Sequence, residues 1–291
     1  MSPARRYVPD LPPVFVGSEA LKDGLLTRGQ LRGPAVRRVL HGVYRLASTP
    51  DSHELRCLAA CLLLPASAVL TGVSAATVLG VPLASVADDV RIVTPEGLTV
   101  PRRRGIHVTE ATRRFTVVSR PDGLRLADRE RVAFDAACRQ PLPQAVARLD
   151  AMARAGVIDV ESFARWLDAD HGNGVRVVRE AARLVDPRSE SQPESVMRVV
   201  LVTAGLPVVP QYVVLHHGRF VARLDLGLPE WRLGIDYDGA WHALREQLER
   251  DRARLNRLHE AGWTVVHVTA AMLHHPDELV ARVRTAIQRS A

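Results

Sequence analysis

Lysine is almost absent from this chain: Lys22 is the only lysine among 39 basic residues, and the others are arginine. Because the arginine guanidinium is nearly impossible to deprotonate, any general base must come from another residue type. Cysteine is also scarce. Cys57 and Cys61 lie one helical turn apart in an Ala/Leu-rich stretch and Cys138 stands alone, which is typical of buried packing rather than of a metal or disulfide site.

Long hydrophobic runs are lacking too. The longest apolar stretch, Cys57 to Leu70, contains Pro65 and is too short to span a bilayer. The N-terminus carries two arginines but no apolar signal core. We therefore expect a cytoplasmic protein with no membrane partner. Internal repeats and low-complexity tracts are absent, and we expect no small-molecule cofactor.

Charge is distributed unevenly along the 291 residues, a length that accommodates two or three domains. The formal net charge is +7 and the pI is near 10.1, which favours an acidic partner such as DNA. Residues 1–50 hold eight Lys/Arg against three Asp/Glu, whereas residues 185–291 hold thirteen of each. The basic excess therefore lies at the front of the chain.

Residues 1–50 have the pattern of a small winged helix-turn-helix domain. A first helical element begins at Ala20–Gly24, a capped second helix follows at Leu26–Leu31, and Gly33–Leu40 fits the recognition element. His41–Leu46 then predicts a hairpin wing. This segment resembles the N-terminal domain of AbiEi-type antitoxins, whose short helical unit ends in an R-G-V-Y-R-like wing.

Arginines of this front segment are the candidates for DNA contacts, on phosphates or groove edges: Arg28, Arg37, Arg38 and Arg45. Most such contacts would be independent of sequence and sensitive to salt. The alternative is a small structural or protein-docking domain.

Residues 51–184 form a connector to which we assign no chemistry. We expect it to be mostly helical, with Ser52–Leu79 helical and a pair of short strands at Asp89–Val93 and Gly105–Val108. Further helices are expected at 128–139, 143–155 and 160–168. Pro187 and the polar residues after it predict a domain boundary, so the last domain comprises residues 185–291.

Two aspartates near the C-terminus each close an apolar segment. Asp225 ends one and Asp236 the next, and Leu-Pro-Glu between them predicts a hairpin. Neighbouring strand ends lie roughly 5 Å apart, so the two carboxylates can share one hard cation such as magnesium, which prefers oxygen ligands. Upstream, Ser191 is a plausible helix N-cap with Glu194 in a capping box, and capping alone is the structural alternative for Glu194.

The run from Ser189 to the C-terminus resembles the DUF559 family of the PD-(D/E)XK restriction-endonuclease-like superfamily, which is related to very-short-patch-repair endonucleases. The matching residues are Ser191, Glu194, Ser195, Arg198, Gln211, Asp225, Ile235-Asp236, Asp238-Gly239, His242, Arg250, Arg252 and Ala261 to Thr269. The resemblance implies an α/β fold class, with a three-layer α/β/α domain in an α+β multidomain chain. It also implies that Glu194, Asp225 and Asp236 hold Mg²⁺ or Mn²⁺ for phosphodiester hydrolysis, with Gln211 in the site.

The chain departs from the superfamily pattern at one catalytic position. A lysine usually stands two residues after the second acid, and Asp238 stands there instead. Since neutral imidazole accepts a proton near pH 7, His242 is the candidate general base, with Asp238 helping to position the water. Arg250 and Arg254 on the following helix are candidates for nucleic-acid backbone contacts. The alternative is a solvated helix with internal ion pairs.

Two functions remain open. The preferred one is a metal-dependent DNA endonuclease with a DNA-binding front end. The alternative is a DNA-binding transcriptional regulator or AbiEi-like antitoxin whose nuclease-like domain has lost catalysis and serves in docking or in a homodimer. RNA processing is a third, weaker option. The endonuclease hypothesis requires Asp225 and Asp236 to converge, and an aspartate buried in a neutralising ion pair with arginine would contradict it.

Overall fold

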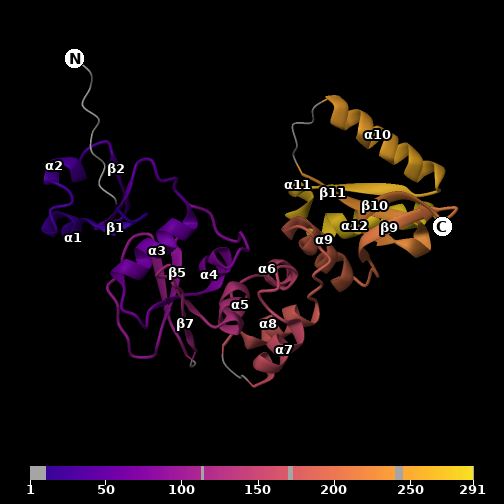
Figure 1. Cartoon of the computed structure of the whole chain (residues 1–291). Helices are drawn as coiled ribbons and strands as arrows, with labels where there is room; N and C mark the ends of the chain where they lie inside the picture. The colour runs from indigo at the N-terminus through magenta and orange to yellow at the C-terminus, as the bar shows by residue number, and fades with distance from the viewer. Residues whose placement is uncertain (1–10, 113–114, 170–172, 240–244, 291) are drawn as a thin grey trace, which may run out of the picture. The chain divides into compact units, whose positions relative to one another are not determined.

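The structure is a computed structural model in which the described residues are 11–112, 115–169, 173–239 and 245–290, with side chains described from residue 252 onward in the last range. They form helices and three β-sheets (Figure 1), so the mixed α and β composition expected from the sequence is confirmed. Among these residues, no helix combines the length and apolar character needed to cross a membrane.

The chain divides by its internal contacts into two compact units, Met1–Ala136 and Ala137–Ala291. The division falls inside the segment expected to be a connector. The helices after residue 137 therefore belong with the C-terminal elements. The division into 1–50, 51–184 and 185–291 stays a prediction.

The first unit begins with a three-stranded sheet and two short helices. Its elements are β1 (Phe15–Val16), α1 (Gly17–Lys22), α2 (Arg28–Leu31), β2 (Val36–Leu40) and β3 (Val43–Leu46), with the strand order β1-β3-β2. The α2 helix is the predicted capped helix: Thr27 and Gln30 form a capping box, in which the Gln30 N–H donates to Thr27 Oγ1 at 3.2 Å and the Thr27 N–H donates to Gln30 Oε1 at 2.8 Å.

The predicted recognition element at Gly33–Leu40 is wrong. Residues Val36–Leu40 of the segment form strand β2, which pairs antiparallel with β3 around a tight turn at His41 and Gly42. Gly42 has φ 86°, a backbone conformation that glycine adopts without strain. The β-branched valines of this segment and the turn glycine favour a hairpin over a helix. The predicted hairpin is therefore present, but its first strand comes from the residues expected to be helical.

The rest of the first unit is built around a five-stranded sheet, with the strand order β6-β5-β4-β8-β7. Its elements are α3 (His53–Leu63), β4 (Val69–Leu70), α4 (Gly72–Val78), β5 (Val90–Thr94), β6 (Ile106–Glu110), β7 (Val117–Ser119), β8 (Arg125–Ala127) and α5 (Arg129–Ala137). The expected helices and the two expected strands are present. Three further short strands, β4, β7 and β8, were not expected, and β4 interrupts the stretch from Ser52 to Leu79 that was expected to be helical.

The second unit carries helices first and then a four-stranded sheet, with the strand order β12-β11-β10-β9. The β9–β10 and β10–β11 pairs are antiparallel and β11–β12 is parallel. Its elements are α6 (Leu142–Arg154), α7 (Val160–Asp168), α8 (Val175–Arg183), α9 (Gln192–Thr203), β9 (Val209–His216), β10 (Arg219–Leu228), a 3₁₀ turn (Pro229–Trp231), β11 (Leu233–Asp238), α10 (Arg245–Glu260), β12 (Thr264–Thr269), α11 (Ala270–Leu273) and α12 (Pro276–Ser290). The predicted hairpin with its Leu-Pro-Glu turn is confirmed.

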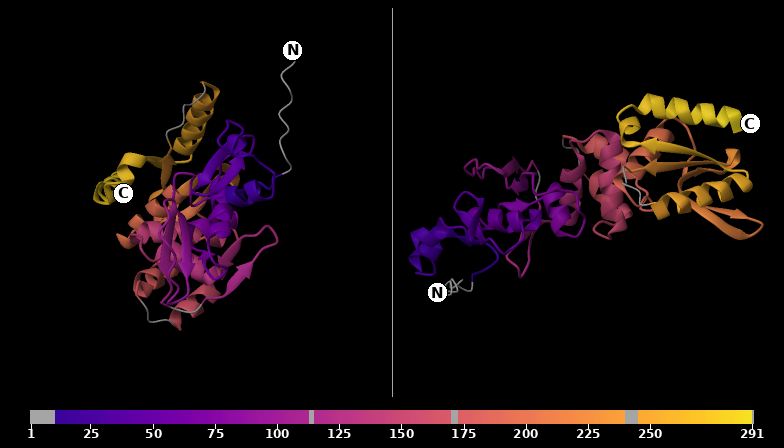
Figure 2. Two further views of the ribbon diagram at one scale, coloured as in Figure 1. Left: turned by 90° about the vertical axis from the view of Figure 1, so that its left-hand side faces the viewer. Right: turned by 90° about the horizontal axis from the view of Figure 1, so that it is seen from above.

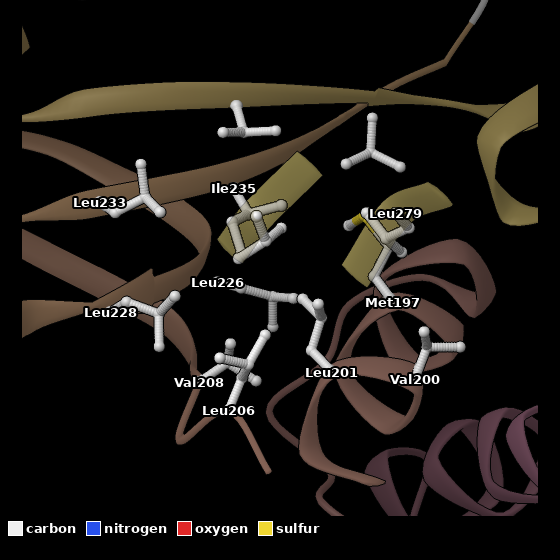
Figure 3. Close-up of a cluster of buried hydrophobic side chains, with 13 residues drawn as sticks. Met197, Val200, Leu201, Leu206, Val208, Leu226, Leu228, Leu233, Ile235 and Leu279 are labelled. Carbon is white, nitrogen blue, oxygen red and sulfur yellow. The ribbon is translucent and has the colours of Figure 1, made fainter. Parts of the chain in front are cut away.

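Helices cover both faces of this sheet, as Figures 1 and 2 show. On one face, Met197 and Leu201 of α9 and Leu279 of α12 pack against Leu226 and Ile235 of the strands (Figure 3). On the other face, the core contains Leu258 of α10, Leu224 of β10 and Trp263. Burying two apolar faces of one sheet is what holds such a layered arrangement together.

A buried ion pair joins α6 to α9 inside the second unit. Arg198 Nη2 donates to Asp150 Oδ2 at 2.8 Å, and the two side chains expose 5% and 0% of their surfaces. Burial raises the pKa of Asp150 above its ordinary value, although Arg198 opposes the rise. The Asp186 N–H donates to Asp150 Oδ1 at 2.8 Å, and Arg198 Nε donates to Ser189 Oγ at 3.3 Å. The pair therefore ties down the loop that precedes α9.

We expect Arg198→Met to lower the free energy of unfolding of the second unit by about 3–5 kcal/mol, because it leaves the Asp150 charge buried without a partner. The double variant Asp150→Leu/Arg198→Met should recover most of that loss. Urea unfolding followed by tryptophan fluorescence measures it, since all four tryptophans lie after residue 137.

Arg188→Met is the matched control, because Arg188 forms an ion pair with Asp186 but exposes 58% of its side-chain surface. Its loss should cost under about 1 kcal/mol. A double variant as unstable as the single Arg198 variant would contradict the assigned cause.

Candidate functional site

The candidate site lies where strands β10 and β11 part. Their ladder has three registered pairs, from Leu228 with Leu233 to Leu226 with Ile235. Beyond it, the N–H of Asp225 donates to Asp236 Oδ1 at 3.0 Å, and the N–H of Tyr237 donates to Asp225 Oδ2 at 2.7 Å. Each aspartate thus accepts a hydrogen bond from the opposite strand. The two carboxylates therefore lie on neighbouring strands, as predicted. The predicted strand ends are wrong, because β10 continues to Leu228 and β11 to Asp238, and the two aspartates meet one position beyond the Leu226–Ile235 pair.

Glu194 approaches this pair from the first turn of α9 and is anchored on both oxygens. Oε1 accepts from Ser191 Oγ at 2.7 Å, and Oε2 accepts from the Glu190 N–H at 2.8 Å and from Gln211 Nε2 at 2.7 Å. The predicted capping role of Ser191 is confirmed, since its hydroxyl also accepts from the Glu194 N–H. Glu194 therefore combines helix capping with a charge near the aspartates.

Gln211 reaches Glu194 from β9. It lies opposite Asp225, between the registered pairs of Tyr212 with Leu224 and Pro210 with Leu226. Its φ of 52° is in the left-handed region, which a residue other than glycine rarely adopts. The irregular backbone occurs where the side chain must turn toward α9, so the predicted association of Gln211 with the acidic residues is seen.

The electrostatics of the site are dominated by negative charge. Burial raises the pKa of Asp225 to about 6, and the charges of Asp236 and Glu194 act in the same direction, whereas the Tyr237 N–H and Arg254 lower it. Among the described residues, Asp225 makes no ion pair. One more positive charge near Asp225 would offset the excess.

Arg254 of α10 is the cation that the structure places on this pair. Its Nη2 donates to Asp236 Oδ2 and to the backbone carbonyl of Arg223, both at 2.8 Å. Asp236 exposes 10% of its side-chain surface and Arg254 exposes 29%. The ion pair that was expected to contradict the hydrolase hypothesis is therefore present at Asp236, so a hydrolase at this site requires Arg254 to leave Asp236. Within the described part of the chain, Asp225 makes no such pair.

A second arginine closes the edge of the site. Both Nη atoms of Arg223 donate to the two oxygens of Glu190 at 2.8 Å, in the bidentate geometry that makes arginine pairs with carboxylates specific. About half of each side chain is exposed. Glu190 also supplies the N–H that binds Glu194, so this exposed pair continues the network that begins at the aspartates.

The donor set fits a small divalent cation only in part. No group of three or more His, Cys, Asp or Glu side chains in the described ranges is arranged to hold a metal ion, so the predicted three-carboxylate set of Glu194, Asp225 and Asp236 is not seen. Asp225 and Asp236 still offer adjacent hard oxygens. Mg²⁺ is commonly held by one or two carboxylates, with waters and substrate phosphate completing its shell. Binding of Mg²⁺ or Mn²⁺ stays a prediction.

Of the two remaining predicted catalytic residues, the structure describes one and not the other. Asp238 is exposed at the end of β11, two residues after Asp236. His242 lies outside the described residues, as does the side chain of Arg250. The predicted role of Asp238 and His242 in positioning water stays a prediction.

The front-segment arginines do not all point to solvent. Arg28 and Arg38 are exposed. Arg45 Nη1 donates to the carbonyls of Leu46 and Thr49, so its guanidinium is bound to its own loop. Arg37 is exposed, and its Nη1 donates to the carbonyls of Pro34 at 2.9 Å and Val36 at 3.2 Å. Arg45 exposes only 14% of its side chain. A nucleic-acid contact of any of these arginines stays a prediction.

Sequence reasoning missed the roles of Arg223 and Glu190, and it placed Arg254 on nucleic acid rather than on Asp236. Arg223 stands two residues before Asp225, which is a usable local signal. Arg254 lies eighteen positions after Asp236 on a separate helix, so no sequence spacing connects the two.

Comparison with known proteins finds relatives over nearly the full length. The chain is 28% identical over 278 residues to two proteins of Mycobacterium tuberculosis, uncharacterized protein Rv2248 of strain ATCC 25618 / H37Rv and uncharacterized protein MT2308 of strain CDC 1551 / Oshkosh. The alignment covers 90% of this chain and 96% of each relative. No protein-family model matches the chain.

We expect Asp225→Asn to stabilise the second unit above pH 6. A carboxyl whose pKa is raised from 3.8 to about 6 in the folded state loses folding free energy as pH rises through that window, because the folded protein then binds more protons than the unfolded chain. Since Asp225 is partly exposed, we expect a gain of about 1–2 kcal/mol at pH 7.5 and none near pH 4.

Urea unfolding in EDTA, followed by tryptophan fluorescence at both pH values, measures this difference. Asp238→Asn removes an exposed charge two residues away and should change stability by under about 0.5 kcal/mol. A stabilisation of Asp225→Asn that is equal at pH 4 and pH 7.5 would show that charge is not the cause.

Proposed function

We propose that residues 185–291 form a metal-dependent DNA endonuclease domain of the restriction-endonuclease-like fold, as the resemblance to the DUF559 family implies. The observation that carries the proposal is the pair of Asp225 and Asp236, whose carboxylates lie side by side at the end of a strand ladder. Helices on both faces of the sheet are compatible with the three-layer arrangement.

An endonuclease site must hydrolyse a phosphodiester, and the negative charge of the diester repels an attacking hydroxide. A bound Mg²⁺ or Mn²⁺ would offset charge at the phosphorus and acidify a water ligand. In this chain Asp225 and Asp236 would hold the ion. Glu194, fixed by Ser191 and Gln211, would add a third negative charge near it.

Proton transfer in this proposal cannot rely on lysine, because Lys22 is the only one in the chain. Asp238 and His242 are the groups proposed to position and deprotonate the attacking water, and a neutral imidazole suits that task near pH 7. Arg223, which is exposed, and Arg254, which is partly buried, lie beside the acidic pair, where guanidinium groups would suit phosphate oxygens.

The second candidate function is a DNA-binding regulator or antitoxin-like protein whose nuclease-like domain is catalytically inactive. Two observations favour it: Asp238 replaces the lysine of the superfamily, and Arg254 neutralises Asp236. In this case the domain would serve in docking or in a homodimer. DNA is the proposed partner under both functions.

Cleavage of supercoiled and mismatched DNA by the full chain tests the endonuclease function. We expect nicking with Mg²⁺ or Mn²⁺, none with EDTA, and a loss of at least about 100-fold in Asp225→Ala, since even changes around a metal site cost 10–100-fold. Glu230→Ala is the control, because Glu230 is exposed at the turn of the same hairpin and should leave nicking unchanged. Tight DNA binding without a cut product under either metal would favour the regulator.

DNA binding by the front segment is proposed to use the β2–β3 hairpin rather than a recognition helix. We expect Arg37→Ala/Arg38→Ala to weaken binding and to lower the salt slope of the affinity by about two, one for each lost phosphate contact. Fluorescence anisotropy with a labelled duplex at several salt concentrations measures both.

The control for that experiment is Arg282→Ala/Arg289→Ala, which removes the same charge from exposed positions of α12. An affinity and slope unchanged in the Arg37/Arg38 variant would remove the hairpin from the DNA-binding surface.

A further inference from the structure

We infer that Arg254 is a resident counter-ion of Asp236 that a divalent cation must displace before it can bind the aspartate pair. The inference rests on the endonuclease function proposed above and adds a regulatory step to its site. In the state described here, the guanidinium bridges Asp236 Oδ2 and the backbone carbonyl of Arg223 at 2.8 Å each.

Competition follows from the way the oxygens of Asp236 are used. Oδ1 accepts the N–H of Asp225, which is fixed in strand β10, whereas Oδ2 accepts from the end of a long side chain on another element, α10. Each oxygen keeps a second lone pair, but the guanidinium on Oδ2 already neutralises the charge of Asp236 that a cation shared with Asp225 would bind. Arg254 is the one of the two donors that can leave without breaking a strand.

Replacing Arg254 by a divalent cation costs less free energy than leaving Asp236 with no positive charge beside it. Asp236 is mostly buried, and a buried charge left without a partner is strongly destabilising. A divalent ion carries one more positive charge than arginine, so it can neutralise Asp225 as well as Asp236. Asp225 makes no ion pair among the described residues, and burial and nearby carboxylates disfavour its charge.

Displacement has a consequence for substrate binding. Arg254 exposes 29% of its side chain, so the released guanidinium can reach solvent beside the acidic pair. Its planar fork matches a phosphate in geometry. Arg254 would thus neutralise Asp236 when no metal ion is bound, and would bind a phosphate of the substrate backbone when the ion is present.

The test is titration of the full chain with Mn²⁺ in the absence of nucleic acid, with free Mn²⁺ followed by electron paramagnetic resonance. We expect Arg254→Met to bind Mn²⁺ about tenfold more tightly than the unaltered chain, which corresponds to about 1.4 kcal/mol. Arg257→Met is the control: Arg257 is exposed one turn further along α10, and its loss removes the same charge, so affinity should change less than about twofold. Adding Asp236→Asn to Arg254→Met should abolish the gain.

Unfolding followed by tryptophan fluorescence gives a second measure. Relative to the unaltered chain, Arg254→Met should be less stable in EDTA and gain more stability from Mn²⁺, because ligand binding to the folded state adds to its stability. If the methionine variant does not fold, Arg254→Lys keeps the charge without the bridging geometry, and its Mn²⁺ affinity should exceed that of the unaltered chain.

The outcomes separate this inference from the function on which it rests. If the unaltered chain binds Mn²⁺ and Arg254→Met binds it equally or more weakly, Arg254 does not compete and the metal site stands. If neither protein binds Mn²⁺ while both are folded, the metal site and the inference fail together.

Discussion

The carboxylates of Asp225 and Asp236 satisfy the backbone where β10 and β11 part. Each accepts an N–H from the opposite strand, and buried N–H groups need such acceptors. The same constraint places two negative charges side by side in a partly buried position, which burial and nearby carboxylates make unfavourable for Asp225. The two aspartates thus satisfy the backbone at the end of the ladder, but their negative charges repel each other, and a bound cation would reduce that repulsion. Everything proposed for the second unit depends on this arrangement.

Helix α9 and the loop before it hold Glu194 in place beside the two aspartates. Glu194 is held by Ser191 and Gln211, so one carboxylate connects the start of α9 to strand β9. The loop before α9 is tied in turn to α6 through the buried pair of Arg198 and Asp150. Helix α6 was expected in a connector without chemistry. It lies in the same compact unit as the site, and its role is to fix the helix that carries Glu194.

Arg254 separates the two functional interpretations. A permanent ion pair at Asp236 would leave a domain with the architecture of a hydrolase and no room for its ion. A displaceable one would give a site that is neutralised at rest and becomes active when a cation arrives. Asp225 makes no ion pair with any residue that the structure describes, which favours displacement, whereas the lysine missing from position 238 favours an inactive domain. Occupancy of Asp236 Oδ2 is the physical quantity that decides between them.

The sequence by itself determined local features: the Thr27 and Ser191 caps, the hairpin that brings Asp225 to Asp236, and the positions of most helices. These depend on propensities, capping and turns within a few residues. Only the tertiary structure decided that Val36–Leu40 is a strand, because its pairing partner β3 had to be found. Tertiary structure also placed Arg254 on an aspartate of a separate strand, since contacts between distant segments arise from packing and leave no periodic signal in the chain.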